Sequence, residues 1–354
     1  MHKVLSLPGR YVQGPGVLGE VGPHLALLGS RAYAFGGRTS MAAADAGLRS
    51  SCSDAGIRLD TGGFAGVCSW AEIDLHKAAA VQASADLIIG VGGGQALDTG
   101  KCVAKALDLP FVSVPTVSAT DTPCSGVARV YTDQAEAAER VVLRHGPELV
   151  VVDTAIVLNS PLRFTVAGMG DALPTMYEAL ACVRAGKPNL RGGAATASAT
   201  AWARLCYEML IAHGVGAVAA IREGRVTDDL ERTVEATALL SCLGFENCGI
   251  AAAHGLWLGF TYVEAFRELK LLHGEGVSIF ALVHLVLEDQ PESTLQEVMS
   301  FCRDVGLPLS LREVGLKDGY SDAVNAGVDA SCAEGFPIHN CVGIAAFELY
   351  VAGV

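Results

Sequence analysis

The sequence predicts an α/β N-terminal half built on a doubly wound parallel sheet, followed by an all-α C-terminal helical domain. Residues 1–160 alternate short apolar runs with helical stretches, as a parallel sheet covered by helices requires. Residues 163–310 are rich in Ala, Leu, Glu and Arg at helical spacing and have few β-branched runs. The residue before a proline is pushed away from helix, so we place the boundary at Ser160 and Pro161. The predicted domains are a nucleotide-binding domain, 1–160, and a helical metal-binding domain, 161–354.

The predicted strands are short apolar runs. The clearest, 86–91, is continuous, as is typical of a strand buried on both faces. A helix is expected after glycines 92–94, and long helices are expected in the second half. The other strands are predicted at 31–35, near 56–59, and at 109–115, 129–132 and 149–152.

Composition excludes several classes of protein. The 354 residues are 51% hydrophobic and 18% charged, with a net charge of −13. Such a field repels phosphate backbones, so we expect neither a nucleic-acid nor a membrane partner. The 11 cysteines form no disulfide-scaffold pattern and are expected to be reduced thiols. No signal peptide and no uncharged apolar run of about 20 residues is evident. We therefore expect a soluble, cytoplasmic protein.

Three glycines, 92–94, lie between the strand 86–91 and the helix predicted after it. Glycines at such a junction let the backbone approach a pyrophosphate, and the helix N-terminus offers unpaired N–H groups. The spacing is not GxGxxG. Taken alone, the run is read equally well as a tight turn without a ligand.

Asp171, His254 and His273 stand out in the helical half. One carboxylate and two imidazoles leave one coordination position open, as a catalytic zinc requires. They are too far apart in the sequence to share a helix, so separate helices would have to converge. Spacing alone does not distinguish these histidines from ordinary core or surface residues.

The segments around these residues resemble the glycerol dehydrogenase group of the iron-type alcohol dehydrogenase and dehydroquinate synthase-like superfamily. The matching segments are GVGGGQALDTGK, VPTVSATDTPCSGVARVYTD, GMGDAL, GFExxGxAAAHG, HGE and GFPIHN. The resemblance implies a zinc-dependent, NAD- or NADP-linked enzyme that interconverts a small polyol or secondary alcohol, such as a vicinal diol, and its hydroxyketone. It also implies a homo-oligomer.

The resemblance further assigns site residues. Asp171, His254 and His273 are implied as metal ligands and catalytic residues, and Asp121 as the residue that contacts the polyol; the alternative for Asp121 is a turn aspartate. The implied cofactor-binding residues are Gly37, Gly93, Gly94, Gln95, Ala96, Leu97, Asp98, Thr116, Ala119, Ser125, Val127 and Tyr131.

The chain departs from the family pattern at two places that bear on metal and cofactor. Thr175 stands where iron-type enzymes have a histidine ligand, which favours the three-ligand zinc branch. Gly37 stands where NAD-dependent relatives have an aspartate that bonds the ribose 2′-hydroxyl, and Arg38 follows it. This change predicts weakened discrimination against NADP.

A third departure concerns the surroundings of the metal. Trp257, Leu258 and Gly276 replace a family histidine, asparagine and lysine. They indicate a bulkier or less polar substrate than glycerol. The alternative is that they pack between helices and leave the pocket unchanged.

Three other functions stay open. A glycerol-1-phosphate dehydrogenase needs Lys or Arg near the metal, and the metal motifs here carry none. A dehydroquinate synthase-like lyase needs still more cations. A catalytically silent NAD-binding relative would have no reason to keep three ligands.

Overall fold

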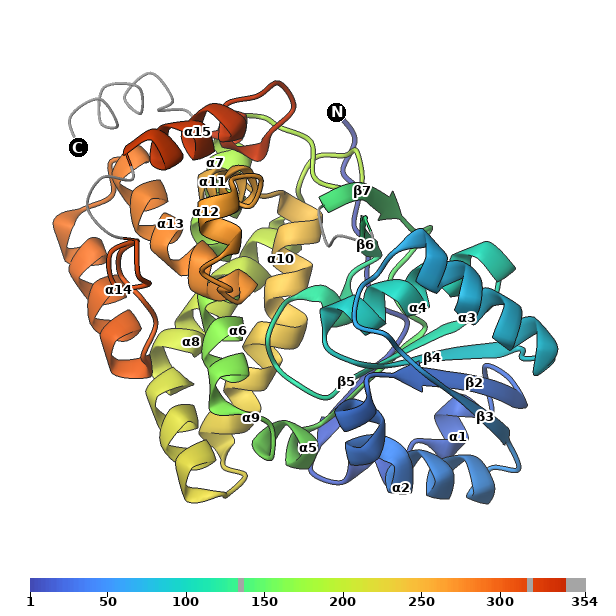
Figure 1. Ribbon diagram of the computed structural model, residues 1–354. Coiled ribbons are helices and arrows are strands. Elements are labelled where there is room, and N and C mark those ends of the chain that lie inside the picture. Colours follow the sequence, from blue (N-terminus) through green and yellow to red (C-terminus); the bar gives the residue numbers. More distant parts are fainter. Residues whose placement is uncertain (133–136, 317–320, 342–354) are drawn as a thin grey trace.

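The computed structural model describes residues 1–132, 137–316 and 321–341. Figure 1 shows a sheet with its covering helices on the right and a bundle of helices on the left, which confirms the predicted fold class. The last strand ends at Asp153, and the first long helix of the bundle begins at Leu162. The domain boundary at residues 160 and 161 stays a prediction.

The N-terminal half is a six-stranded parallel sheet in the order β1-β8-β5-β4-β2-β3. A separate antiparallel hairpin, β6–β7, projects from it. The strands are β1 (Tyr11–Gly14), β2 (Arg31–Gly36), β3 (Arg58–Gly63), β4 (Leu87–Gly92), β5 (Phe111–Pro115), β6 (Val127–Tyr131), β7 (Ala137–Val142) and β8 (Leu149–Asp153).

Helices cover both faces of the sheet. On one face α1 (Gly22–Leu25) and α2 (Arg38–Asp54) pack on Leu87, Ile89 and Val91 of β4. On the other, α3 (Trp70–Gln82) and α4 (Gly94–Leu107) pack on Ile88. Alternate residues of one strand thus enter two cores, which is why its sequence is apolar throughout.

The strand predictions were less accurate at the margins of the sheet. β3 begins at Arg58, later than predicted, and it is an edge strand of mixed exposure with no apolar run. β1 and β7 were not predicted. β1 (YVQG) is half-buried at the other edge, and β7 (AAERVV) carries two charges. Such segments lack the hydrophobic signal that marks an interior strand.

The C-terminal half is helical. Two hydrophobic clusters fill it, one around α6, α8 and α14 and one around α11, α13 and α15. A third joins β8 to α8 and α9. The helices are α5 (Thr154–Leu158), α6 (Leu162–Ala172), α7 (Thr175–Arg184), α8 (Ala197–Glu223), α9 (Asp228–Glu235), the π-helix η3 (Ala236–Leu240), α10 (Ser241–Cys248), α11 (Ala252–Phe260), α12 (Glu264–Arg267), α13 (His273–Leu287), α14 (Glu292–Val305) and α15 (Ser321–Ser331), with 3-10 turns η1 (Val17–Gly19), η2 (Thr122–Cys124) and η4 (Pro337–Asn340).

Helix α8 is long and apolar enough, by length and composition alone, to cross a membrane. It lies inside the helical half, where Cys206, Leu210 and Ala217 are fully buried against other helices. It is therefore a core helix. Ten of the 11 cysteines are likewise buried thiols.

Candidate active site

The junction between β4 and α4 leaves the start of α4 open. A Cβ atom on Gly93 would come no closer than 3.6 Å to Val117 Cγ2, and one on Gly94 no closer than 3.4 Å to Thr120 Oγ1. At Gly100 the same atom would lie 2.4 Å from Phe111. Gly100 therefore serves packing, whereas Gly93 and Gly94 keep space free over the first amides of α4. That space fits an anionic group such as a pyrophosphate.

Gly93 and Thr116 also line a cavity of about 820 Å³. Its walls include Ser40 at the start of α2, together with Ser160 and Phe164 at the start of the helical half. The cavity lies at the carboxyl ends of the parallel strands. It is close to the point between β2 and β4 where the order of the strands along the sheet changes direction, and α/β proteins bind ligands at such points.

Lys101 organises the loop that follows β5. Its side chain is fully buried, and Nζ donates to Asp98 Oδ1 at 3.0 Å and Ser125 Oγ at 3.0 Å. It also donates to the backbone oxygens of Thr122 and Val127, both at 2.8 Å. Asp98 accepts a further bond from the backbone N–H of Arg129 at 2.9 Å. Asp98 and Ser125, both predicted to bind cofactor, are thus engaged by Lys101 and shape the loop.

The other predicted cofactor residues are placed as follows. Ala96 and Leu97 are buried in the first turn of α4, so only their backbone can face a ligand. Gln95 Oε1 accepts from the Cys68 N–H at 2.8 Å, and Thr116 Oγ1 donates to Ser40 Oγ at 3.0 Å. Ala119 is partly exposed in the loop, Tyr131 ends β6, and Gly37 precedes α2.

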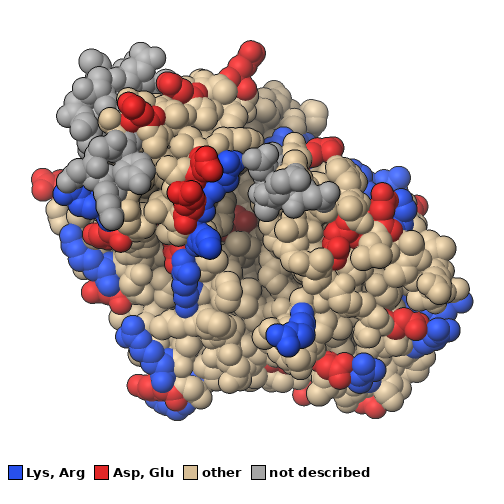
Figure 2. All heavy atoms as spheres, in the orientation of Figure 1, with Lys and Arg blue, Asp and Glu red and all other residues tan. Residues whose placement is uncertain are grey.

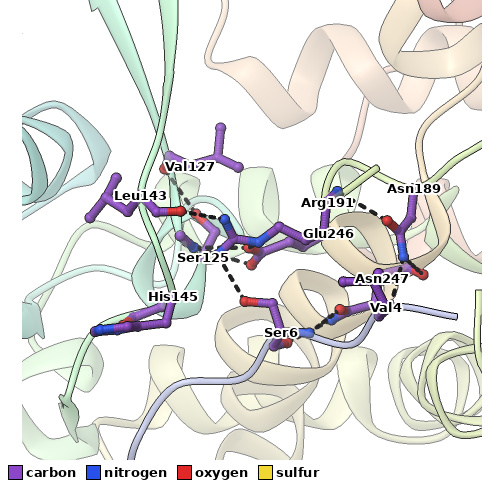
Figure 3. A network of polar contacts seen from close by, with 12 residues as sticks. Val4, Ser6, Ser125, Val127, Leu143, His145, Asn189, Arg191, Glu246 and Asn247 are labelled. Atoms are coloured by element: carbon purple, nitrogen blue, oxygen red, sulfur yellow. Dashed lines mark hydrogen bonds and ion pairs between the residues drawn. The ribbon is translucent and has the colours of Figure 1, made fainter. Parts of the chain in front are cut away.

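A buried ion pair supports the same loop from the helical half (Figure 3). Glu246 on α10 accepts from the Gly126 N–H at 3.1 and 3.2 Å, and its carboxylate lies 2.7 Å from Arg191 Nε. Arg191 also donates to the Leu143 backbone oxygen at 2.5 Å and to Ser6 Oγ at 2.8 Å. The N-terminal segment, the hairpin and α10 therefore meet behind Ser125.

Asp171, His254 and His273 converge from α6, α11 and α13. One ligand atom of each lies within 4.8 Å of the others. Asp171 Oδ1 is 3.2 Å from both His254 Nε2 and His273 Nε2. Tetrahedral zinc, with bonds of about 2.0–2.1 Å, would place its ligand atoms about 3.3 Å apart, which matches both separations from Asp171 Oδ1.

The metal triad opens to solvent at one ligand. The side chains of Asp171 and His254 are 1% and 9% exposed, whereas that of His273 is 47% exposed. Figure 2 shows the surface hollowed between the helical half and the sheet half, with acidic atoms visible in the hollow.

Glycines allow the helices of the triad to meet so closely. A Cβ atom on Gly274, next to His273, would lie 1.7 Å from the Ala167 backbone oxygen on α6. One on Gly168 would lie 2.0 Å from the Ser118 backbone oxygen. Only glycine at these positions lets α13 and the loop between β5 and β6 (the cofactor loop, residues 116–126) approach α6. The glycines of GMGD and HGE therefore position Asp171 against His273 and the loop.

Glu178, on α7, fixes His254. Its buried carboxylate accepts from His254 Nδ1 at 2.5 Å and from the backbone N–H groups of Ala251 and His254 at 2.8 and 3.0 Å. It thus caps the N-terminus of α11 and leaves His254 Nε2 facing Asp171. Burial opposes a charge on His254, yet Glu178 and Asp171 raise its pKa well above the usual value.

Asp121 connects the two sites. Its backbone N–H donates to Asp171 Oδ2 at 3.2 Å, and its side chain is partly exposed. Burial and the neighbouring Asp171 raise the pKa of Asp121 well above the usual value. Burial would also raise the pKa of Asp171, but His273 and His254 reverse the effect and lower it.

Comparison with known proteins agrees with this geometry. The family model for iron-containing alcohol dehydrogenase matches residues 8–154. The chain is 38% identical to the glycerol dehydrogenase of Escherichia coli, in an alignment that covers 97% of this chain and 93% of that protein. It is 42% identical to the glycerol dehydrogenase of Thermotoga maritima, with 94% of this chain and 90% of that protein covered. This chain belongs to the iron-containing alcohol dehydrogenase family.

A solved structure of a family member has the same fold throughout. A probable glycerol dehydrogenase from Sinorhizobium meliloti 1021 superposes with a TM-score of 0.89 at 34% identity, over 99% of this chain and all of that one. The resemblance inferred from the motifs is confirmed, and the protein is a glycerol dehydrogenase-like alcohol dehydrogenase.

Two interpretations were given for the residues of this alcohol dehydrogenase that differ from the family pattern near the metal: a bulkier substrate, or packing between helices. The structure bears on the second. Trp257 is 5% exposed and lies against Gly276, while Leu258 is partly exposed. Trp257 and Gly276 therefore pack between helices, which is one part of the alternative; that the pocket is unchanged stays a prediction. Thr175 is buried, and its hydroxyl is 3.0 Å from Ser241 Oγ. Its side chain is thus engaged by α10.

Sequence reasoning missed several supporting residues of this alcohol dehydrogenase. Glu178 and His254 are distant in the sequence, so no local pattern could pair them. Lys101 and Glu246 stand inside the motifs GVGGGQALDTGK and GFExxGxAAAHG, and their fixed places there were the available signal. The indole of Trp257 donates to His273 Nδ1 at 3.1 Å, which no sequence feature indicated.

Proposed function

We propose that this protein is a zinc-dependent, nicotinamide-linked dehydrogenase that interconverts a small vicinal diol or secondary alcohol and its hydroxyketone. One observation carries the proposal: the hydrogen bond from Asp121 to Asp171, which joins the cofactor loop to the metal triad. Hydride transfer requires the alcohol carbon and the cofactor to meet in one place. The glycerol dehydrogenase relatives support a glycerol-like substrate.

Asp171, His254 and His273 would hold the metal. Zinc suits a mixed set of one carboxylate and two imidazoles and keeps an open position with three protein ligands. The engagement of Thr175 by Ser241 supports a three-ligand site. When bound, zinc would supply Lewis acidity toward the substrate hydroxyl.

The residues of the chain supply the remaining functions. Glu178 holds the His254 ring so that Nε2 faces Asp171. Asp121, partly exposed beside the triad, is proposed to accept a hydrogen bond from a second hydroxyl of the diol. Lys101 and Glu246 hold the backbone of the cofactor loop in place.

For the cofactor we propose NAD or NADP with its pyrophosphate over the first amides of α4. The residues at the start of α2 support binding of NADP, which carries a 2′-phosphate on its adenosine ribose. Gly37 offers no carboxylate, and Arg38 is exposed beside a cavity of about 510 Å³ at the ends of β2 and β3. We also propose that the protein is a homo-oligomer, as the family resemblance implies.

Replacing His254 with Ala tests the proposal. We expect loss of stoichiometric zinc and a fall of at least about 1,000-fold in kcat/KM, since one ligand of three is removed. The measurements are metal analysis and nicotinamide absorbance with glycerol, 1,2-propanediol and 2,3-butanediol. His213→Ala is the control, because His213 pairs with Asp229 away from the triad. Full retention of zinc and turnover by His254→Ala would refute the proposal.

A further inference from the structure

Trp257 and Gly276 occupy two separate departures from the family pattern, and the structure places them in direct contact. A Cβ atom on Gly276 would lie 2.3 Å from Trp257 Cδ2 and 2.4 Å from Cε3. Those atoms belong to a ring that is 5% exposed and packs near Phe280, with ring centroids 6.5 Å apart. The indole can therefore occupy this place only opposite a glycine. The two departures are one structural change.

The indole ends on a residue of the metal triad. Trp257 Nε1 lies 3.1 Å from His273 Nδ1, while His273 Nε2 lies 3.2 Å from Asp171 Oδ1. An indole N–H can only donate a hydrogen bond, so His273 Nδ1 must accept it. In a neutral imidazole the ring proton then resides on Nε2. That is the atom which faces the carboxylate of the triad.

His254 has the opposite arrangement. Glu178 accepts the hydrogen bond from His254 Nδ1, so a metal can take the place of the proton on Nε2, which faces Asp171, while Nδ1 keeps its own proton. A histidine that binds a metal almost always donates its other ring N–H to an acceptor, which fixes the useful tautomer. Glu178 meets this requirement for His254. Trp257 does the reverse for His273.

We propose that Trp257 is a positioning residue that holds His273 in the tautomer unable to bind a metal through Nε2, and that Gly276 is present to admit the indole. The inference rests on the proposed metal centre. Metal binding at His273 then requires loss of the indole hydrogen bond, transfer of the Nε2 proton to solvent and uptake of a proton from solvent by Nδ1. One proton leaves Nε2 and one is taken up at Nδ1, so the protons balance. The triad therefore binds its metal more weakly than it would without the indole donor.

Trp257→Phe tests the sign of this effect, because it removes the donor and keeps an aromatic ring at this position. We expect the zinc dissociation constant of the metal-depleted protein to fall about tenfold, at the lower end of the range by which partners of ligating histidines change metal affinity. Competition with a chromogenic chelator measures it. If the indole merely supports the site structurally, zinc binding should weaken instead. Trp70→Phe is the control, since Trp70 is half-exposed on α3 in the sheet half.

A second measurement does not depend on that variant. The chain has three tryptophans, so Trp70→Phe with Trp202→Phe leaves Trp257 as the sole indole. Zinc addition should change its emission, because the N–H loses its acceptor. If neither this double variant nor Trp257→Phe bound zinc, the metal centre and this inference would both be wrong. Zinc binding with unchanged emission, or with equal or weaker affinity in Trp257→Phe, would overturn this inference and leave the metal centre standing.

Discussion

The two sides of the candidate active site are each organised by one buried charge, and the charges have opposite sign. On the cofactor side, Lys101 donates to four oxygen acceptors around the loop. On the metal side, Glu178 accepts from three N–H groups at the start of α11. Both charges are fully buried, so each depends on its hydrogen bonds for compensation.

The difference lies in what the two charges hold. The polar groups around Lys101 form hydrogen bonds with one another, so residues of the protein alone hold the loop in shape. On the metal side they do not: His254, which Glu178 holds, and His273 both meet one oxygen of Asp171, an arrangement suited to a divalent cation. Changes on the cofactor side should therefore appear first as a loss of stability. Changes on the metal side should appear first as altered metal affinity.

The largest effect is expected for Lys101→Met. It leaves the Asp98 carboxylate buried without its cation, and breaking such a pair lowers the free energy of unfolding by about 3–5 kcal/mol. Denaturant unfolding followed by circular dichroism measures the change. Asp98→Asn with Lys101→Met should recover part of it, because no buried charge is then left unpaired.

Lys105→Met is the matched control for Lys101→Met. Lys105 lies one turn further along α4, is exposed, and donates to the Val142 backbone oxygen at 2.9 Å. The same substitution there should stay within about 0.5 kcal/mol of the parent. Equal stabilities for the two variants would contradict the role assigned to Lys101.

Glu178→Gln should move the metal side instead. The amide oxygen can still accept from the backbone of α11, but the amide NH₂ then faces His254 Nδ1 as a donor. His254 would receive the kind of partner that Trp257 gives His273, with its proton on Nε2. We expect the zinc dissociation constant to rise about 10- to 100-fold, measured by chelator competition, with a smaller loss of stability than in Lys101→Met.

Glu72→Gln is the control for Glu178→Gln, since Glu72 is a buried glutamate 3.2 Å from His76 Nε2 in the sheet half. Its zinc affinity should match that of the parent. An unchanged zinc affinity in Glu178→Gln would show that the second partner of His254 does not govern metal binding, and the contrast between the two sides would fail.

The same contrast explains what the sequence could predict. The sheet interior was predictable because β4 and β5 enter two cores, are buried at every position and are mostly apolar. The start of α4 was predictable because Gly93 and Gly94 stand at a strand–helix junction. β1 and β7 carry no such signal, being short, mixed in polarity and marginal to the main sheet.

The metal triad was named through family resemblance, because the spacing of Asp171, His254 and His273 has no meaning until three helices are packed. Its supporting residues could not be predicted in the same way. Glu178 reaches His254 only because α7 packs across the start of α11. Trp257 was read first as a wall of the pocket, since a sequence does not show that Gly276 makes room for its ring between helices.

The smallest expected effect is on the cofactor side but outside the Lys101 network, and it sharpens the comparison. Gly37→Asp introduces a carboxylate where a Cβ atom meets nothing closer than Ser40 Oγ at 4.0 Å, so the fold should accept it with unchanged stability. The Arg38 side chain makes no hydrogen bond or ion pair with the described part of the chain and lines the adjacent cavity. We expect the ratio of NADPH to NADH dissociation constants to rise about tenfold, equivalent to about 1.4 kcal/mol. Nucleotide fluorescence titration measures the ratio, and Arg38→Ala should weaken the binding of NADPH alone.

If the parent already rejected NADPH strongly and Gly37→Asp changed nothing, other residues would discriminate against the 2′-phosphate. The cofactor side would then depend on more than the loop that Lys101 holds.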